Sequence, residues 1–210
     1  MNKLEEIFNA ITHGVGFLAS IVGLVFLCWF SAKTQDADVI TGCVLFGCSM
    51  ILLYLFSSLY HSLVFTRAGN LFQIFDHSAI FILIAGTYTP ILLNFHTVFG
   101  LVTFIIMWSV AAAGITLEAV FGHRVKKISM ILYFLMGWVI VAAWKPLKYS
   151  VDPKFIWWIL GGGLFYSLGA VFYAFQERKG FHVIWHLFVL GGTVMHYLGI
   201  VFYIAMPRGI

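Results

Sequence analysis

Histidine, serine and aspartate residues recur at helical spacing inside apolar stretches of this 210-residue chain. Ser57 and His61 lie four residues apart near the end of one stretch, His182 and His186 lie four apart at the start of another, and Asp76 opens a third. Imidazole and carboxylate groups are costly in hydrocarbon, so such a set indicates a functional site. Three histidines with an open fourth position are also a common way to hold catalytic zinc.

The spacing of these residues indicates which of them could act together. Residues four apart share one face of a helix, one turn apart, so His182 and His186 could chelate one ion. His61 would supply a third nitrogen from a neighbouring helix, and zinc accepts neutral imidazole while leaving a position for water. Asp76 would orient a histidine or accept a proton from that water. Ser57 would hold the water or donate to a developing oxyanion.

The composition places these motifs in a membrane protein. Hydrophobic residues make up 62% of the chain and charged residues 10%, and the mean hydropathy is +1.00. A soluble domain has about a quarter of its residues charged, so this chain could not cover a water-facing surface. The net charge of +4 is spread over short loops with no basic stripe, which argues against nucleic-acid binding.

Seven apolar runs are long enough to span a membrane, where a helix needs about 20 residues. They are longer than barrel strands and apolar all round, so they predict helices. The chain is therefore expected to be all-α, a polytopic seven-helix bundle in a single domain, 1–210. The runs cover about 12–32, 40–64, 75–94, 98–118, 128–145, 155–176 and 183–205.

The loop charges predict an orientation. The N-terminus and the loops after the second, fourth and sixth runs hold seven bases, and the other side holds five. Positive residues favour the cytoplasmic side, so the N-terminus is expected in the cytoplasm of a cell (plasma or inner) membrane protein. The second run ends on the cytoplasmic side, and the third and seventh runs begin there. This places the candidate site residues in the cytoplasmic leaflet: Ser57, His61, Asp76, His182 and His186.

Other polar residues are candidates to support this site. Asn9 and His13 form another pair four apart, and Glu118 closes the fourth run on the same side. His196 lies 14 residues after His182 and projects beneath the cluster. Purely structural roles are the alternatives. Asn9 could cap the helix, Glu118 could face water, and the other polar groups could form interhelical hydrogen bonds. A lone HxxxH pattern is also a weak signal, whereas three elements at one depth favour a metal.

The motifs together resemble the progestin and adipoQ receptor superfamily, and in particular its bacterial branch, the hemolysin III family. The resemblance covers nearly the whole chain. It is carried by Ser57-x-x-x-His61, Phe75-Asp76-His77-Ser78, His182-Val-Ile-Trp-His186, His196-Tyr-Leu-Gly199, Glu6-x-x-Asn9-x-x-x-His13-Gly14 and Gly86-Thr-Tyr-Thr-Pro90.

The resemblance implies seven membrane helices with a cytoplasmic N-terminus. Adiponectin receptors bind zinc through three histidines, so it implies that role for His61, His182 and His186, with Asp76 and Ser57 near the bound water. The superfamily also includes alkaline ceramidases, which hydrolyse a lipid amide, and its bacterial members are linked to lipid and fluidity homeostasis. The adiponectin receptors have Tyr where His77 stands, which leaves open a further metal contact or a different substrate.

Three functions follow as hypotheses. The leading one is a zinc-dependent hydrolase of a lipid amide or ester, with a role in lipid homeostasis. The second is a non-enzymatic regulator or receptor with structural zinc, and the third is a haemolytic pore-forming protein, for which no route to a target membrane is evident. A retinal protein would need a lysine in the last run, and three histidines with aspartate suit zinc better than haem. Membrane lipids are the expected partners, and a homo-oligomer is left open.

Overall fold

Six helices are long and apolar enough to cross a membrane in the computed structural model, which describes residues 2–142 and 144–206. No strand occurs in these residues, so the prediction of an all-α polytopic membrane protein is confirmed. The six are α1 (Lys3–Ala32), α2 (Ala37–Leu63), α3 (Gly69–Leu93), α4 (Val98–Phe121), α8 (Pro153–Ala174) and α9 (Phe181–Ile200), the last continued by the π-helical turn η2 (Val201–Ala205).

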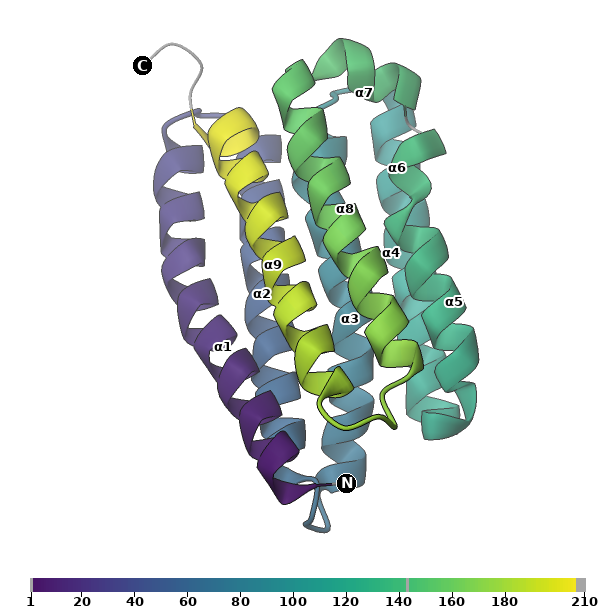
Figure 1. Ribbon diagram of the computed structural model, residues 1–210. Coiled ribbons are helices and arrows are strands. Elements are labelled where there is room, and N and C mark those ends of the chain that lie inside the picture. The colour runs from purple at the N-terminus through teal and green to yellow at the C-terminus, as the bar shows by residue number, and fades with distance from the viewer. Residues whose placement is uncertain (1, 143, 207–210) are drawn as a thin grey trace.

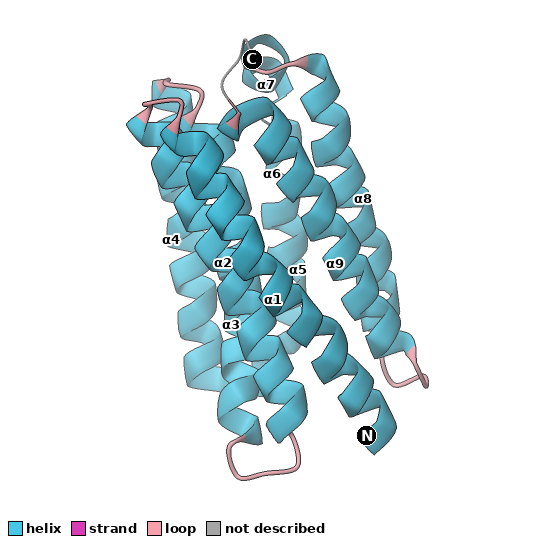
Figure 2. Cartoon of the chain, turned by 90° about the vertical axis from the view of Figure 1, so that its left-hand side faces the viewer, coloured by secondary structure: helices cyan, strands magenta, loops and turns pink. Residues whose placement is uncertain are grey.

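The helices run up and down in chain order, joined by short turns (Figure 1). Side chains of Asn2, Asp36, Thr97 and Asp152 accept hydrogen bonds from the first free backbone N–H groups of α1, α2, α4 and α8. α1 packs against α2 and α9 along one side of the bundle, as Figures 1 and 2 show. The ends of α2 and the starts of α3 and α9 therefore meet at one end, where α1 begins.

The predicted fifth span, 128–145, is not one continuous helix, and residue 143 lies outside the described residues. The chain here forms the 3-10 turn η1 (Gly122–Val125), α5 (Lys126–Gly137), α6 (Val139–Ala142) and α7 (Trp144–Ser150). The break at Trp138 is stabilised by α3, because the hydroxyl of Tyr88 donates to the carbonyl of Gly137 and accepts from the N–H of Ile140. These bonds replace backbone bonds that a break in hydrocarbon would otherwise leave unpaired.

The first helix is polar on its inner side and apolar on its outer side. Its buried positions follow a three- and four-residue spacing, and most are polar or small. Its Leu, Ile, Val and Phe side chains are mostly exposed, as expected for a surface that faces lipid. The polar stripe is Glu6, Asn9, His13, Gly16, Ser20, Gly23, Leu27 and Ser31.

Candidate metal centre

Three histidines from two helices converge at the end of the bundle where α1 begins. His61 lies in the last turn of α2, while His182 and His186 lie in the first two turns of α9. One ring nitrogen from each lies within 4.8 Å of the others, so the three form a group that could hold one metal ion. Histidine binds zinc at about 2.0–2.1 Å, so small side-chain movements would bring all three onto one ion.

Each of these imidazoles uses its Nδ1 for a hydrogen bond to a group outside the triad. Nδ1 of His61 is 2.6 Å from Oε2 of Glu6, and Nδ1 of His182 is 3.0 Å from Oε1 of Gln176. Nδ1 of His186 is 3.3 Å from the backbone oxygen of Asn9. All three partners are acceptors, so Nδ1 donates and Nε2 is left with its lone pair free.

The outer hydrogen bonds of these histidines match those that metal-binding histidines usually make. Metal-binding histidines usually donate their other N–H to a carboxylate or carbonyl, which fixes the ring and its tautomer. The Nε2 atom of His61 is buried and has no hydrogen-bond partner in the described chain. Such an atom is costly unless something binds it, and a group of three imidazoles suits zinc or another imidazole-binding metal.

The outer partners Glu6 and Gln176 were not predicted as site residues. Glu6 is 7% exposed and belongs to the polar stripe of α1, whose spacing connects it to Asn9 and His13. That spacing was a usable signal for Glu6. Gln176 lies in the turn between α8 and α9, and no motif marked it. Nearby, Glu5 accepts a hydrogen bond from the N–H of Gly180, which ties α1 to the same turn.

His13 lies behind the triad. Its ring stacks on His186 with centroids 3.7 Å apart and an angle of 11°, and its other contact is the edge of Tyr54 at 5.0 Å. Neither ring nitrogen has a hydrogen-bond partner in the described chain. His13 therefore packs against one of the three triad histidines, and it also forms part of the cavity wall.

A cavity of about 380 Å³ runs from the triad along the inside of the bundle. Ser57, Asp76, His182 and His186 line it at the triad end, and His61 is buried beside them. Asp76 is 8% exposed and is not one of the three residues of the candidate metal group. The predicted residues are therefore brought together, with Asp76 and Ser57 beside the triad.

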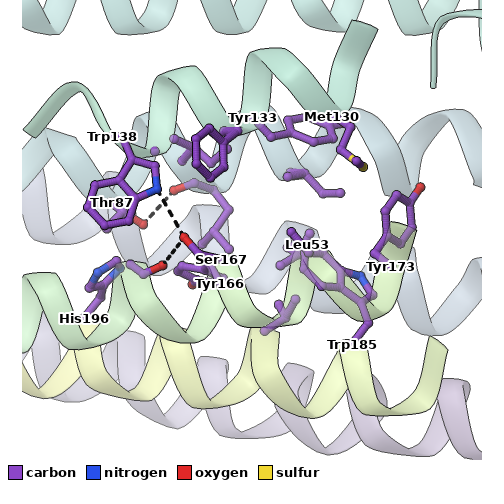
Figure 3. Close-up of a pocket in the computed structure, with 18 of the residues that line it drawn as sticks. Leu53, Thr87, Met130, Tyr133, Trp138, Tyr166, Ser167, Tyr173, Trp185 and His196 are labelled. Carbon is purple, nitrogen blue, oxygen red and sulfur yellow. Dashed lines mark hydrogen bonds between the residues drawn. The ribbon is translucent and has the colours of Figure 1, made fainter. Parts of the chain in front are cut away.

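The cavity lies mainly between α3, α5, α8 and α9, and its wall is largely apolar. Figure 3 shows Tyr173 and Trp185 at one end of it and Trp138, Ser167 and His196 at the other. The indole N–H of Trp138 donates to Ser167, joining α5 to α8. The break after Gly137 therefore also shapes the cavity, because it lets Trp138 reach across to α8.

His196 is not part of the triad cluster. It lies ten residues after His186, roughly 15 Å along the helix, at the far end of the cavity. Its Nε2 donates to the backbone oxygen of Ile159 at 3.0 Å, and its ring occupies the space that a side chain on Gly162 would need. The predicted supporting role for His196 can therefore apply only to the distal end.

Glu118 does not face water. It is 1% exposed, and it pairs with His77, the residue after Asp76. Nδ1 of His77 is 3.4 Å from Oε2 of Glu118, and His77 also lines the cavity. His77 is not among the grouped metal ligands, so the structure gives no support to a further metal contact from it.

A second group of potential ligands lies at the opposite end of the bundle. His96, in the turn after α3, is 3.4 Å from Asp36, which caps α2, and 3.2 Å from Asp38 in the first turn of α2. These side chains are more exposed than the triad, and exposed acidic groups of this kind are common without a metal. The buried histidine triad is the stronger candidate.

Comparison with known proteins identifies the family of this chain. A family model described as "Haemolysin-III related" matches residues 1–197. The chain belongs to the haemolysin-III-related family. It is 43% identical over 186 residues to "Hemolysin-3" of Bacillus cereus, covering 88% of this chain and 85% of that protein. It is 44% identical over 186 residues to the "Hemolysin-3 homolog" of Bacillus subtilis (strain 168), covering 88% and 87%.

The haemolysin-III-related segment contains every residue of the candidate centre. The match over 1–197 includes the stripe of α1, the triad, Asp76 and the cavity-lining part of α9 up to His196. The site is therefore a feature of the family-matched region of this chain.

Proposed function

We propose that this haemolysin-III-related protein is a zinc-dependent membrane hydrolase that cleaves an amide or ester bond of a membrane lipid. The observation that carries the proposal is the convergence of three imidazole rings at one end of a largely apolar cavity inside membrane-spanning helices. Ser57 and Asp76 lie in the wall of the same cavity.

Zinc is the preferred ion because neutral imidazole is one of its usual ligands and because each ring already has its outer hydrogen bond in place. His61, His182 and His186 would hold it. When bound at such a site, zinc polarises a carbonyl oxygen and makes water more acidic.

The remaining residues supply the proton transfers. The carboxylate of Asp76 would accept a proton from the attacking water as the new C–O bond forms. It would return that proton to the leaving nitrogen or oxygen as the old bond breaks. The hydroxyl of Ser57, one turn before His61, would donate a hydrogen bond to the carbonyl oxygen as it gains charge.

The apolar part of the cavity suits an alkyl chain. Between the polar ends its wall includes Leu53, Ile80, Ile84 and Val189. A chain bound there would leave its headgroup at the triad, so the scissile bond would lie beside Asp76. Membrane lipids are therefore the proposed substrates and partners, with the protein in the cell membrane and the triad in its cytoplasmic leaflet.

The test is turnover by detergent-purified protein on amide and ester lipids with one common acyl chain, with products measured by mass spectrometry. Asp76→Asn is expected to lower the rate about 10²–10⁴-fold, as loss of a general base does. Ser57→Ala is expected to lower it about 10²–10³-fold. His96→Gln, a histidine change at the opposite end of the bundle, serves as the control. Equal rates in wild type and Asp76→Asn would contradict the assignment.

A haemolytic activity is the second candidate, favoured only by the printed names of the two Bacillus relatives. Its test is release of a trapped dye from liposomes by purified protein. Release that persists in the His61/His182/His186 triple alanine variant would separate this activity from the proposed hydrolase site.

A further inference from the structure

A second polar cluster meets the cavity on the side of α3, one residue from Asp76. His77 lies in the cavity wall, and its Nδ1 points to the carboxylate of Glu118 on α4, 3.4 Å from Oε2. That distance is longer than a good hydrogen bond, so the contact is an electrostatic pairing that a small movement would tighten. This cluster is not used by the triad or by its outer partners.

Glu118 is buried inside the bundle, where other side chains contact its carboxylate. Its side chain is 1% exposed, and Oε1 accepts a hydrogen bond from Ser129 on α5. Apart from the pairing with His77, Oε2 has no partner in the described chain. A carboxylate in a membrane-spanning helix is expensive and usually marks a function, with its partner named. Here the partner is His77.

His77 is held from its backbone as well. The hydroxyl of Tyr133, on α5, donates to the backbone oxygen of His77 at 2.8 Å. Three helices therefore position His77: α3 carries it, Glu118 of α4 faces its ring, and α5 holds its backbone through Tyr133 and holds Glu118 through Ser129. Such support is typical of a side chain whose direction matters for binding.

The free nitrogen of His77 determines what it can bind. Because Nδ1 faces the carboxylate, Nδ1 carries a proton, and Nε2 is the nitrogen left for another partner. Nε2 makes no hydrogen bond in the described chain, and the His77 side chain lines the cavity and is 11% exposed. Nε2 accepts a hydrogen bond when the ring is neutral and donates one when the ring is charged. A hydroxyl group satisfies either state, because it both donates and accepts.

We infer that His77, oriented by Glu118, is a specificity-determining residue that binds a hydroxyl group of a lipid headgroup beside the histidine triad. This inference rests on the proposed function, because it needs a lipid in the cavity. It specifies a hydroxyl group on the lipid headgroup, a feature that the proposed roles of the triad and Asp76 do not specify.

The experiment measures binding rather than turnover. Trp138 and Trp185 line the cavity, so a brominated alkyl chain bound there will quench their fluorescence. Two ethers with the same brominated chain serve as probes, one with a 2-hydroxyethyl headgroup and one with an n-propyl headgroup. They differ only in hydroxyl against methyl, and a hydrolase of amides or esters does not cleave either.

Wild-type protein is expected to bind the hydroxyethyl ether about fivefold to tenfold more tightly, which corresponds to one hydrogen bond. His77→Phe is expected to bind both ethers with equal affinity, and Glu118→Gln to show a smaller preference than wild type. Thr87→Val is the matched control on the same helix, because Thr87 lines the cavity but its hydroxyl already donates to Leu83. It should keep the preference.

The outcomes separate this inference from the proposed function. Probes that bind and quench equally in wild type, or a preference that persists in His77→Phe, would overturn the role of His77 and leave a lipid cavity. Failure of both probes to bind wild-type protein would overturn the lipid cavity and the role of His77 together. The ratio of two affinities in one variant also distinguishes recognition from a general loss of folding.

Discussion

Replacement of Glu6 by glutamine is the sharpest perturbation of the candidate centre that leaves all three ligands in place. Glu6 Oε2 lies 2.6 Å from Nδ1 of His61, a length typical of charge-assisted hydrogen bonds, and both side chains are buried. Glutamine keeps an oxygen acceptor of nearly the same reach but removes the negative charge. The substitution therefore tests whether the carboxylate strengthens the ligand on the other side of the ring.

The magnitude follows from that change in bond type. A hydrogen bond to a charged group contributes about 1.5–3 kcal/mol, and a neutral one about 0.5–1.5 kcal/mol. The difference, about 1–1.5 kcal/mol, corresponds to roughly fivefold to tenfold in affinity. Outer-shell substitutions at metal sites generally cost about 10–100-fold. Zinc affinity in Glu6→Gln is therefore expected to fall about tenfold.

The assay is competition for zinc between metal-depleted protein in detergent and a fluorescent chelator of known affinity. Glu177→Gln is the matched control, since it makes the same chemical change in an exposed side chain at the same end of the bundle. It should bind zinc as wild type does. Wild-type affinity in a folded Glu6→Gln protein would refute the reasoning, and an equal loss in Glu177→Gln would attribute the effect to surface charge.

Three further predictions concern the fold around the site. Tyr88→Phe should destabilise the bundle by about 1–3 kcal/mol, seen as a lower melting temperature, because Gly137 and Ile140 lose their bridging hydroxyl. Gly42→Ala should destabilise it by about 1–3 kcal/mol, since its Cβ would lie 2.5 Å from the Cα of Pro90; Gly163→Ala, where a Cβ meets nothing, should not. In a cysteine-free background on spheroplasts, an impermeant maleimide should label Lys148→Cys and not Lys179→Cys. The reverse pattern would contradict the cytoplasmic N-terminus.

The sequence predicted much of the site because its residues obey simple periodic rules. His182 and His186 lie one helical turn apart, and alternation of the spans places His61 at the same end as both. Six of the seven expected spans appear as single helices, because hydrocarbon demands long apolar segments. Four of them lie within three residues of their predicted bounds, whereas α1 begins nine residues and α3 six residues before the predicted start. The histidines and Asp76 stood out because polar and charged side chains are costly in hydrocarbon.

The features that were missed depend on contacts that no local pattern encodes. The break at Trp138 depends on Tyr88, about fifty residues earlier, and apolar residues on both sides of the break conceal it. Gln176 reaches His182 from a turn with no motif. Glu118 was expected either to support the site or to face water, and burial beside His77 excludes water. The break at Trp138 and the burial of Glu118 each depend on the packing of three helices, which composition and periodicity do not contain.

The most direct test of the central claim is the zinc content of detergent-purified wild-type protein, measured by elemental analysis beside the His61/His182/His186 triple alanine variant. A single three-histidine site is expected to hold about one zinc ion per chain in wild type, and the variant, if its melting temperature shows that it remains folded, is expected to hold none. Folded wild-type protein that contains no zinc and takes up none when supplied would contradict the central claim.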